Sequence, residues 1–80
     1  MEHEEVKQRV KKAVSEVLKI DQSEIDDNAD FIFDLGADSI QSIQLIAAFE
    51  EEFNIEMDED EALSIQTISG AVDFIAGYLN

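Results

Sequence analysis

Apolar side chains recur at helical spacing in three separate stretches of this chain, and this periodicity most constrains its fold. The stretches are residues 2–19, 39–53 and 67–79, and a shorter helical turn is predicted within residues 54–66. The chain contains no proline, so nothing in the sequence interrupts them. We therefore predict an all-α protein, a four-helix bundle of three longer helices and one short helix with a long first loop. The first apolar stripe consists of Val6, Val10, Ala13, Val14, Val17 and Leu18.

The chain has 80 residues, and we take residues 1–80 as one domain, near the lower size at which a core is stable without help. It has no cysteine and a single histidine, so it has neither a disulfide nor a cluster for structural zinc. The acidic run from Asp26 has Phe31 and Ala37 where a calcium-binding EF-hand loop needs glycine and glutamate. We predict no metal site, and stability must come from helix packing.

Charge is distributed very unevenly along the chain. Residues 1–19 hold all five Lys and Arg residues, whereas residues 20–80 hold sixteen Asp and Glu residues and no basic residue. A surface this acidic argues against nucleic acid and anionic lipid as partners, because both are recognised through Lys and Arg. It favours partner proteins with basic docking surfaces, although the charge could also serve solubility alone.

The first residues of the chain are acidic and lack the apolar core of a signal peptide. No apolar run approaches the length that spans a membrane. We therefore expect a cytoplasmic monomer with no membrane partner.

The connection between the first two predicted helices, residues 20–38, is long and rich in Asp and Asn. A loop of this length in a small domain is usually functional or is held by its own side chains. The apolar side chains available to pin it against the bundle are Ile25, Phe31, Phe33 and Leu35.

The end of this connection presents a serine at the start of the most apolar helix. Gly36 allows a tight approach, and Asp38 and Ser39 are short polar residues of the kind that cap a helix N-terminus. The free N–H groups and the positive dipole end of a helix favour a phosphate there. Ser39 is therefore the candidate attachment point for a phosphodiester.

The run Asp-Leu-Gly-Ala-Asp-Ser-Ile at residues 34–40, followed by an apolar helix that ends Phe-Glu-Glu-Glu-Phe, resembles the acyl carrier proteins. The resemblance covers nearly the whole chain. It implies that a phosphopantetheinyl transferase adds 4'-phosphopantetheine to Ser39 and that the thiol of this arm holds acyl groups as thioesters. The carrier would present them to acyl-loading and acyl-processing enzymes of fatty acid, lipid or polyketide biosynthesis. It also implies that the attached chain enters the core between the second helix and the short helix.

The helix at residues 39–53 is apolar on two sides. Its core side is predicted to hold Leu45, Ile46, Phe49 and Phe53. Since the opposite side also carries apolar residues, we predict that it docks a partner, unless Ile40 and Ile43 pack beneath the preceding loop. The candidate partner-binding residues are Asp38, Ile40, Ile43, Ala47, Glu50 and Glu51.

Two positions depart from the pattern of the resembled family, which commonly has acids there for basic partners to grip. They are Gln41 and Gln44 in this chain. We therefore expect a specialised, free-standing carrier that serves a dedicated pathway. The run Ser-Ile-Gln-x-Ile-Gln-Leu is also similar to aminoacyl and peptidyl carrier domains of nonribosomal pathways, which stay open as an alternative.

Two further alternatives need no carrier function. An enzyme would need a base beside Ser39, but the only histidine is His3 near the N-terminus, and the motif around the serine is not a nucleophile elbow. We expect no enzymatic activity. A non-carrier acidic helical interaction module would leave Ser39 as an ordinary helix cap and would give no reason for the motif before it.

The sixteen uncompensated acids in residues 20–80 should repel one another at low salt. Added salt or divalent cations should therefore raise the melting temperature, which calorimetry across a salt titration measures. A flat response would contradict this prediction.

Overall fold

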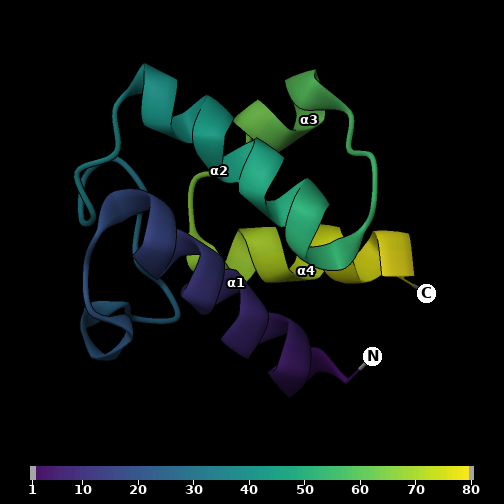
Figure 1. The fold of residues 1–80 in the computed structure, drawn as a ribbon, viewed down its shortest axis with the longest axis horizontal. Helices are drawn as coiled ribbons and strands as arrows, with labels where there is room; N and C mark the ends of the chain where they lie inside the picture. Colours follow the sequence, from purple (N-terminus) through teal and green to yellow (C-terminus); the bar gives the residue numbers. More distant parts are fainter. Residues whose placement is uncertain (1, 80) are drawn as a thin grey trace.

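The computed structural model describes residues 2–79, which form four helices and no strand (Figure 1). This architecture confirms the predicted all-α bundle of three longer helices and one short helix. The second helix begins and ends where the sequence predicts, and none of the helices in residues 2–79 has the length and apolar character needed to cross a membrane. The elements are α1 (His3–Leu18), the 3-10 turn η1 (Gln22–Glu24), α2 (Ser39–Phe53), α3 (Glu59–Leu63) and α4 (Ile68–Leu79).

Helix α1 is the centre of the bundle and packs against both α2 and α4. The first four residues of its predicted stripe are buried, whereas Val17 and Leu18 are half-buried. Helix α2 contributes Leu45, Phe49 and Phe53 to the same core. Helix α1 ends one residue earlier than predicted, because Lys19 adopts a left-handed conformation at its C-cap with φ of 57°. The most deeply buried side chains come from α1 and α4: Val6, Val10, Val14, Ile68, Val72 and Ile75.

Arg9 of α1 fastens the end of α2 to the centre of the bundle. Its Nε donates to Glu52 Oε2 at 2.7 Å, and its Nη2 donates to the Glu52 carbonyl oxygen at 2.6 Å. The guanidinium group also lies 4.9 Å from the centre of the Phe53 ring. One half-buried cation therefore satisfies a carboxylate, a free helix-end carbonyl and an aromatic face together.

The long first loop is fixed at several points along its length. Its Asp27 carboxylate accepts hydrogen bonds from both Lys7 and Lys11 of α1. Further along, Phe31 N–H donates to the Gln66 carbonyl at 2.9 Å, beside an isolated antiparallel bridge between Asp30 and Thr67. The loop is thus held against α1 on one side and against the start of α4 on the other.

The prediction of which apolar side chains hold this loop against the bundle is confirmed only in part. Ile25 and Phe31 are buried, as predicted, and Leu35 is half-buried. The prediction for Phe33 is wrong, because this side chain is 89% exposed. Backbone hydrogen bonds direct the turn that carries Phe33 away from the core, so a loop position cannot be assigned to the interior from residue type alone.

Helix α3 is short and packs mainly on α2. Asp58 followed three residues later by Glu61 has the spacing of a capping pair, and Asp58 does cap the helix by accepting from Glu61 N–H at 3.0 Å. The connection before it is held by Met57 N–H, which donates to Glu50 Oε2 at 2.8 Å, and by Asp58 N–H, which donates to the Tyr78 hydroxyl at 3.2 Å. Few contacts therefore hold α3 to the rest of the bundle.

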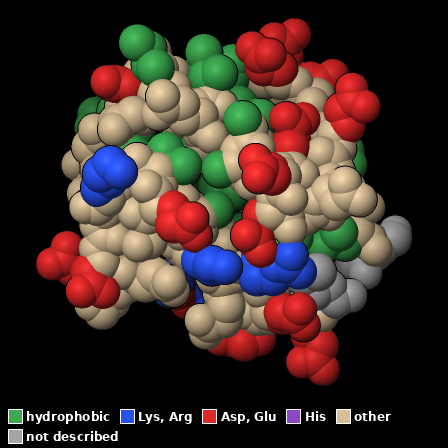
Figure 2. All heavy atoms as spheres, in the orientation of Figure 1, with side chains coloured by type: hydrophobic (Ala, Val, Ile, Leu, Met, Phe, Trp, Pro, Cys, Tyr) green, Lys and Arg blue, Asp and Glu red, His purple; other side chains and the backbone are tan. Residues whose placement is uncertain are grey.

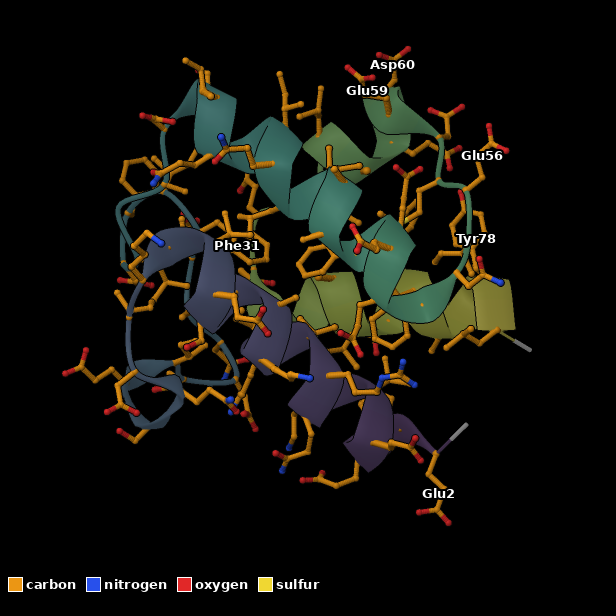
Figure 3. All side chains as sticks on the ribbon, viewed as in Figure 1. Glu2, Phe31, Glu56, Glu59, Asp60 and Tyr78 are labelled. Carbon is orange, nitrogen blue, oxygen red and sulfur yellow. The ribbon has the colours of Figure 1, made fainter. Side chains whose placement is uncertain are left out.

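The inner side of α3 differs from the prediction. Within the short helical turn, the sequence predicts that Ala62, Leu63 and Ile65 face the core. Ala62 is buried and Ile65 is half-buried, but Leu63 is 45% exposed. Figure 3 shows Glu59 and Asp60 directed away from the bundle at the start of this helix. A helix of five residues makes little more than one turn, so it cannot bury two successive apolar side chains equally.

The ion pairs of Asp27 predict a pH dependence of stability. Hydrogen bonds from Lys11 and then Lys7 hold the pKa of Asp27 below its usual value of 3.8. A carboxyl with a lowered pKa in the folded state stabilises the fold above its usual pKa, and this contribution is lost as the pH falls through the lowered value. We expect Asp27→Asn to lower the melting temperature at pH 7 and to have less effect as the pH falls below 3.8.

The control variant is Asp26→Asn, because the neighbouring Asp26 is exposed and makes no ion pair within residues 2–79. Thermal unfolding of the three proteins between pH 3 and pH 7, followed by circular dichroism, measures both differences. A gap between Asp27→Asn and the unchanged protein that stays constant over this range would refute the ion-pair account.

Candidate functional site

Ser39 is the first residue of α2, and Asp38 is its cap. Gln41 N–H donates to Asp38 Oδ1 at 2.7 Å, and Asp38 N–H donates to Gln41 Oε1 at 3.2 Å. This reciprocal capping box leaves the Ser39 side chain with no capping role. The Ser39 hydroxyl is on an exposed residue and makes no hydrogen bond within residues 2–79.

The backbone around Ser39 is oriented by the residues before it. Gly36 has φ of +76°, a left-handed conformation that a side chain would strain, and the buried Ala37 follows it. Ala37 N–H donates to the Phe31 carbonyl at 2.8 Å. The first N–H groups of a helix have no partner inside the helix, and Asp38 satisfies only the one on Gln41. The N–H groups of Ser39 and Ile40 therefore remain available to an anion.

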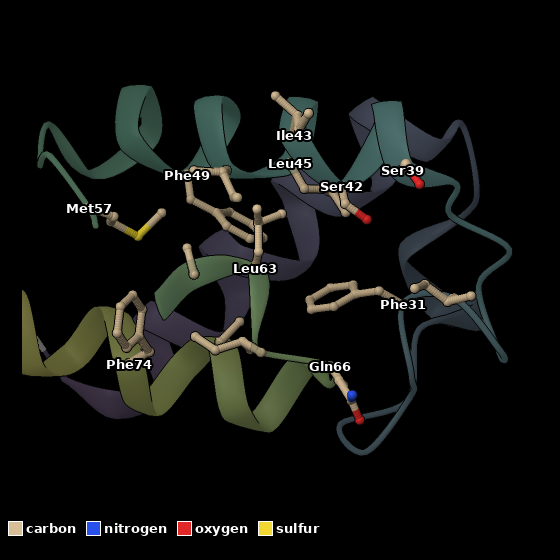
Figure 4. Close-up of a pocket in the computed structure, with 15 residues that line it drawn as sticks. Phe31, Ser39, Ser42, Ile43, Leu45, Phe49, Met57, Leu63, Gln66 and Phe74 are labelled. Atoms are coloured by element: carbon tan, nitrogen blue, oxygen red, sulfur yellow. The ribbon is translucent and has the colours of Figure 1, made fainter. Parts of the chain in front are cut away.

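An apolar cavity of about 380 Å³ lies between α2, α3 and α4, and Ser39 is at its edge (Figure 4). Figure 4 shows Ser39 and Ser42 at one end of this cavity and Met57 and Phe74 at the other. None of the residues that line it is charged. Its walls are Phe31, Ile32, Ser39, Ser42, Ile43, Leu45, Ile46, Phe49, Met57, Ala62, Leu63, Ile65, Gln66, Ala71 and Phe74.

Two half-exposed side chains border the opening of this cavity. Ile43 of α2 is 52% exposed and Leu63 of α3 is 45% exposed, and both also line the cavity. Phe31 points into the cavity from the first loop (Figure 4), and its ring centre lies 6.5 Å from that of Phe49. Leu63, whose exposure the sequence did not predict, is therefore both at the surface and on the cavity wall.

The predicted partner-binding residues lie along one side of α2, but they differ in solvent exposure and in hydrogen bonding. Ile40 is 68% exposed, and Ile43, Ala47 and Glu51 are exposed as well. The alternative in which Ile40 and Ile43 pack beneath the loop is therefore wrong. Glu50 is half-buried, and its carboxylate accepts the hydrogen bond from Met57 N–H.

Gln41 has a structural role that the sequence analysis missed. We treated this position only as a missing docking charge, whereas its side chain completes the capping box of α2. The signal was present in the sequence, since Asp38 followed three residues later by Gln41 is the spacing of such a box.

The described residues provide no catalytic partner or metal cluster for Ser39. His3 lies at the start of α1, bonded to exposed Asp73 of α4 at 3.1 Å. The starts of α1 and α2 are at opposite corners of the molecule in Figure 1. Between residues 2 and 79, no group of three or more His, Asp or Glu side chains is arranged to hold a metal ion.

Because Asp38 caps α2, the Ser39 hydroxyl at the start of this helix is left without a hydrogen bond, at the edge of an apolar cavity. This combination is the site of a small helical carrier domain. Residues 8–75 match the family described as "phosphopantetheine attachment site". The chain belongs to this family, whose domain is the site of covalent 4'-phosphopantetheine attachment. Such a domain interacts with a transferase that adds the arm and with biosynthetic enzymes that use it. An exposed hydroxyl beside free helix N–H groups fits this arm.

The capping box gives a prediction about the start of α2. Asp38→Ala removes the acceptor of Gln41 N–H and should lower the free energy of unfolding by about 1 kcal/mol. Asp38→Asn keeps a side-chain oxygen at the same position and should cost much less. Urea unfolding measures both changes, and equal losses in the two variants would contradict the role of the cap.

Proposed function

We propose that Ser39 carries 4'-phosphopantetheine and that the protein holds acyl groups as thioesters for biosynthetic enzymes. The observation that carries this proposal is the exposed, unbonded Ser39 hydroxyl at the edge of an apolar cavity of about 380 Å³. The arm supplies a thiol, which this chain lacks because it contains no cysteine.

The residues around Ser39 are suited to hold the phosphate of the arm. The N–H groups of Ser39 and Ile40 point out of the first turn of α2, where the helix dipole also favours negative charge. The Asp38 carboxylate is nearby but is bonded to Gln41 N–H, which partly offsets its charge. The helix start therefore binds and orients the phosphate without a basic side chain.

The lining of the cavity favours acyl groups over aminoacyl groups. An aminoacyl thioester carries an ammonium group, and burying an unpaired charge is costly. No carboxylate lines the cavity, so an ammonium group would find no partner inside it. An apolar acyl chain from a fatty acid, lipid or polyketide pathway would replace water there at no such cost.

The same arrangement supports a carrier over an enzyme. Within residues 2–79, His3 is bonded to Asp73 far from Ser39, and the Asp38 carboxylate is engaged with Gln41 N–H, so we expect a partner enzyme to supply the base for attachment of the arm. The acidic surface, with Glu51 exposed on the docking side of α2, suits partners with basic docking surfaces. In Figure 2, acidic side chains are scattered around the face shown, and Lys and Arg side chains appear in only a few places.

Mass spectrometry of the intact protein tests the proposal directly. After incubation with coenzyme A and a broad-specificity phosphopantetheinyl transferase, the unchanged protein should gain one phosphopantetheine and Ser39→Ala should gain none. Ser42→Ala is the matched control, because Ser42 lines the same cavity one turn further along α2 and should not affect the gain. An unmodified but folded protein, or modification of Ser39→Ala, would refute the assignment.

A further inference from the structure

Large apolar side chains reach the surface mainly around Ser39. Residues 2–79 contain six that are strongly exposed, and four of them lie between positions 32 and 43. These four, which we call the Ser39 patch, are Ile32, Phe33, Ile40 and Ile43, with exposed fractions of 54%, 89%, 68% and 52%. In Figure 2, hydrophobic side chains reach the surface over the first half of α2. The acyl cavity does not account for Phe33 or Ile40, because neither residue lines it.

Phe33 is displayed by a turn that Asp30 fixes. Asp30 Oδ1 accepts hydrogen bonds from the N–H groups of Ile32 and Phe33, each at 2.9 Å. The Asp30 carbonyl accepts from the N–H groups of Asp34 and Leu35, each at 3.0 Å. Asp30 N–H in turn donates to Asp34 Oδ2 at 2.8 Å. Five hydrogen bonds therefore hold the backbone that carries the exposed ring.

A fixed backbone under an exposed aromatic ring is the arrangement of a binding anchor. Aromatic residues supply much of the affinity of many protein interfaces, and prior ordering of the backbone lowers the entropy lost on binding. A solvent-facing position in a loop gains no stability from a phenylalanine, because the ring is left almost entirely in water. The turn therefore favours a role in binding for Phe33.

The charges around the Ser39 patch indicate the chemistry of its partner. The first eleven residues of α2, from Ser39 to Phe49, contain no charged side chain. Exposed Asp34 and Asp38 stand on the chain between Phe33 and Ile40. A complementary surface would have an apolar socket with basic residues at its rim.

We propose that Phe33 is the anchor by which this carrier docks on the phosphopantetheinyl transferase that modifies Ser39, with the rest of the Ser39 patch completing the contact. The proposal rests on the proposed function, because the transferase must bring its active site to the Ser39 hydroxyl. Ile40 adjoins Ser39 in α2, and Ile32 and Ile43 line the same cavity as Ser39. An enzyme that reaches this hydroxyl therefore meets Ile32, Ile40 and Ile43, and Phe33 follows Ile32 in the turn that Asp30 holds.

The test is a kinetic comparison of Phe33→Gln, Phe33→Tyr and the unchanged chain as substrates of a broad-specificity phosphopantetheinyl transferase with coenzyme A. Loss of an aromatic anchor should raise the KM for the carrier about tenfold or more and leave kcat unchanged. Phe33→Tyr keeps the ring and should retain most of the affinity. Gln22→Ala is the control, because it changes an exposed, neutral side chain of the same loop that lies outside the Ser39 patch and makes no side-chain hydrogen bond within residues 2–79.

The other outcomes overturn the proposal in different ways. An unchanged KM for Phe33→Gln, with Ser39 still modified, refutes the anchor and leaves the carrier function intact. A folded protein that is never modified refutes both. Sedimentation that shows a dimer dissociated by Phe33→Gln would mean that a second copy of the chain covers the patch. Melting temperatures should match, because Phe33 lies outside the core.

Discussion

The capping box formed by Asp38 and Gln41 determines where α2 begins, and the site depends on that point. Because Asp38 occupies the cap, Ser39 becomes the first helical residue and its hydroxyl is left unbonded. A start one residue later would make Ser39 the cap, and its oxygen would then bond the backbone. Gly36 and the turn fixed by Asp30 bring the chain to this point in one conformation. Local hydrogen bonds, more than the core, define the chemistry of the site.

The basic residues of α1 explain how a chain of net charge −15 folds and still presents an acidic surface. Lys7 and Lys11 bond to Asp27 of the first loop, and Arg9 bonds to Glu52 at the end of α2. These cations lie between α1 and the segments packed on it, so they offset repulsion where the elements meet. The electrostatic field of the acidic side chains elsewhere extends into solvent, where it can attract a partner protein with a basic surface.

The sequence predicted the elements and the position of Ser39 at the start of α2, but it did not predict the surface of the loop. Helical periodicity identified the buried stripe of α1 and the bounds of α2, because a helix relates spacing to direction. An irregular loop has no such relation, so Phe31 and Phe33 looked equivalent although one is buried and the other is exposed. The exposure of Leu63 could not be predicted for a similar reason, because α3 makes only about one turn and spacing then says little about direction. Gln41 was missed for a different reason, since its capping spacing could have been recognised.

The two walls of the cavity differ in how firmly contacts hold them in place. Ser39 stands on α2, which Arg9 fastens to α1 and the capping box fixes at its start. The opposite wall is α3, five residues long, packed mainly on α2 and preceded by a connection held by Glu50 and Tyr78. Local opening costs least where few buried contacts are lost. For the proposed carrier function, an acyl chain would therefore enter most easily by displacing α3 while Ser39 keeps its position, and cargo of different lengths would then leave the surface around Ser39 unaltered.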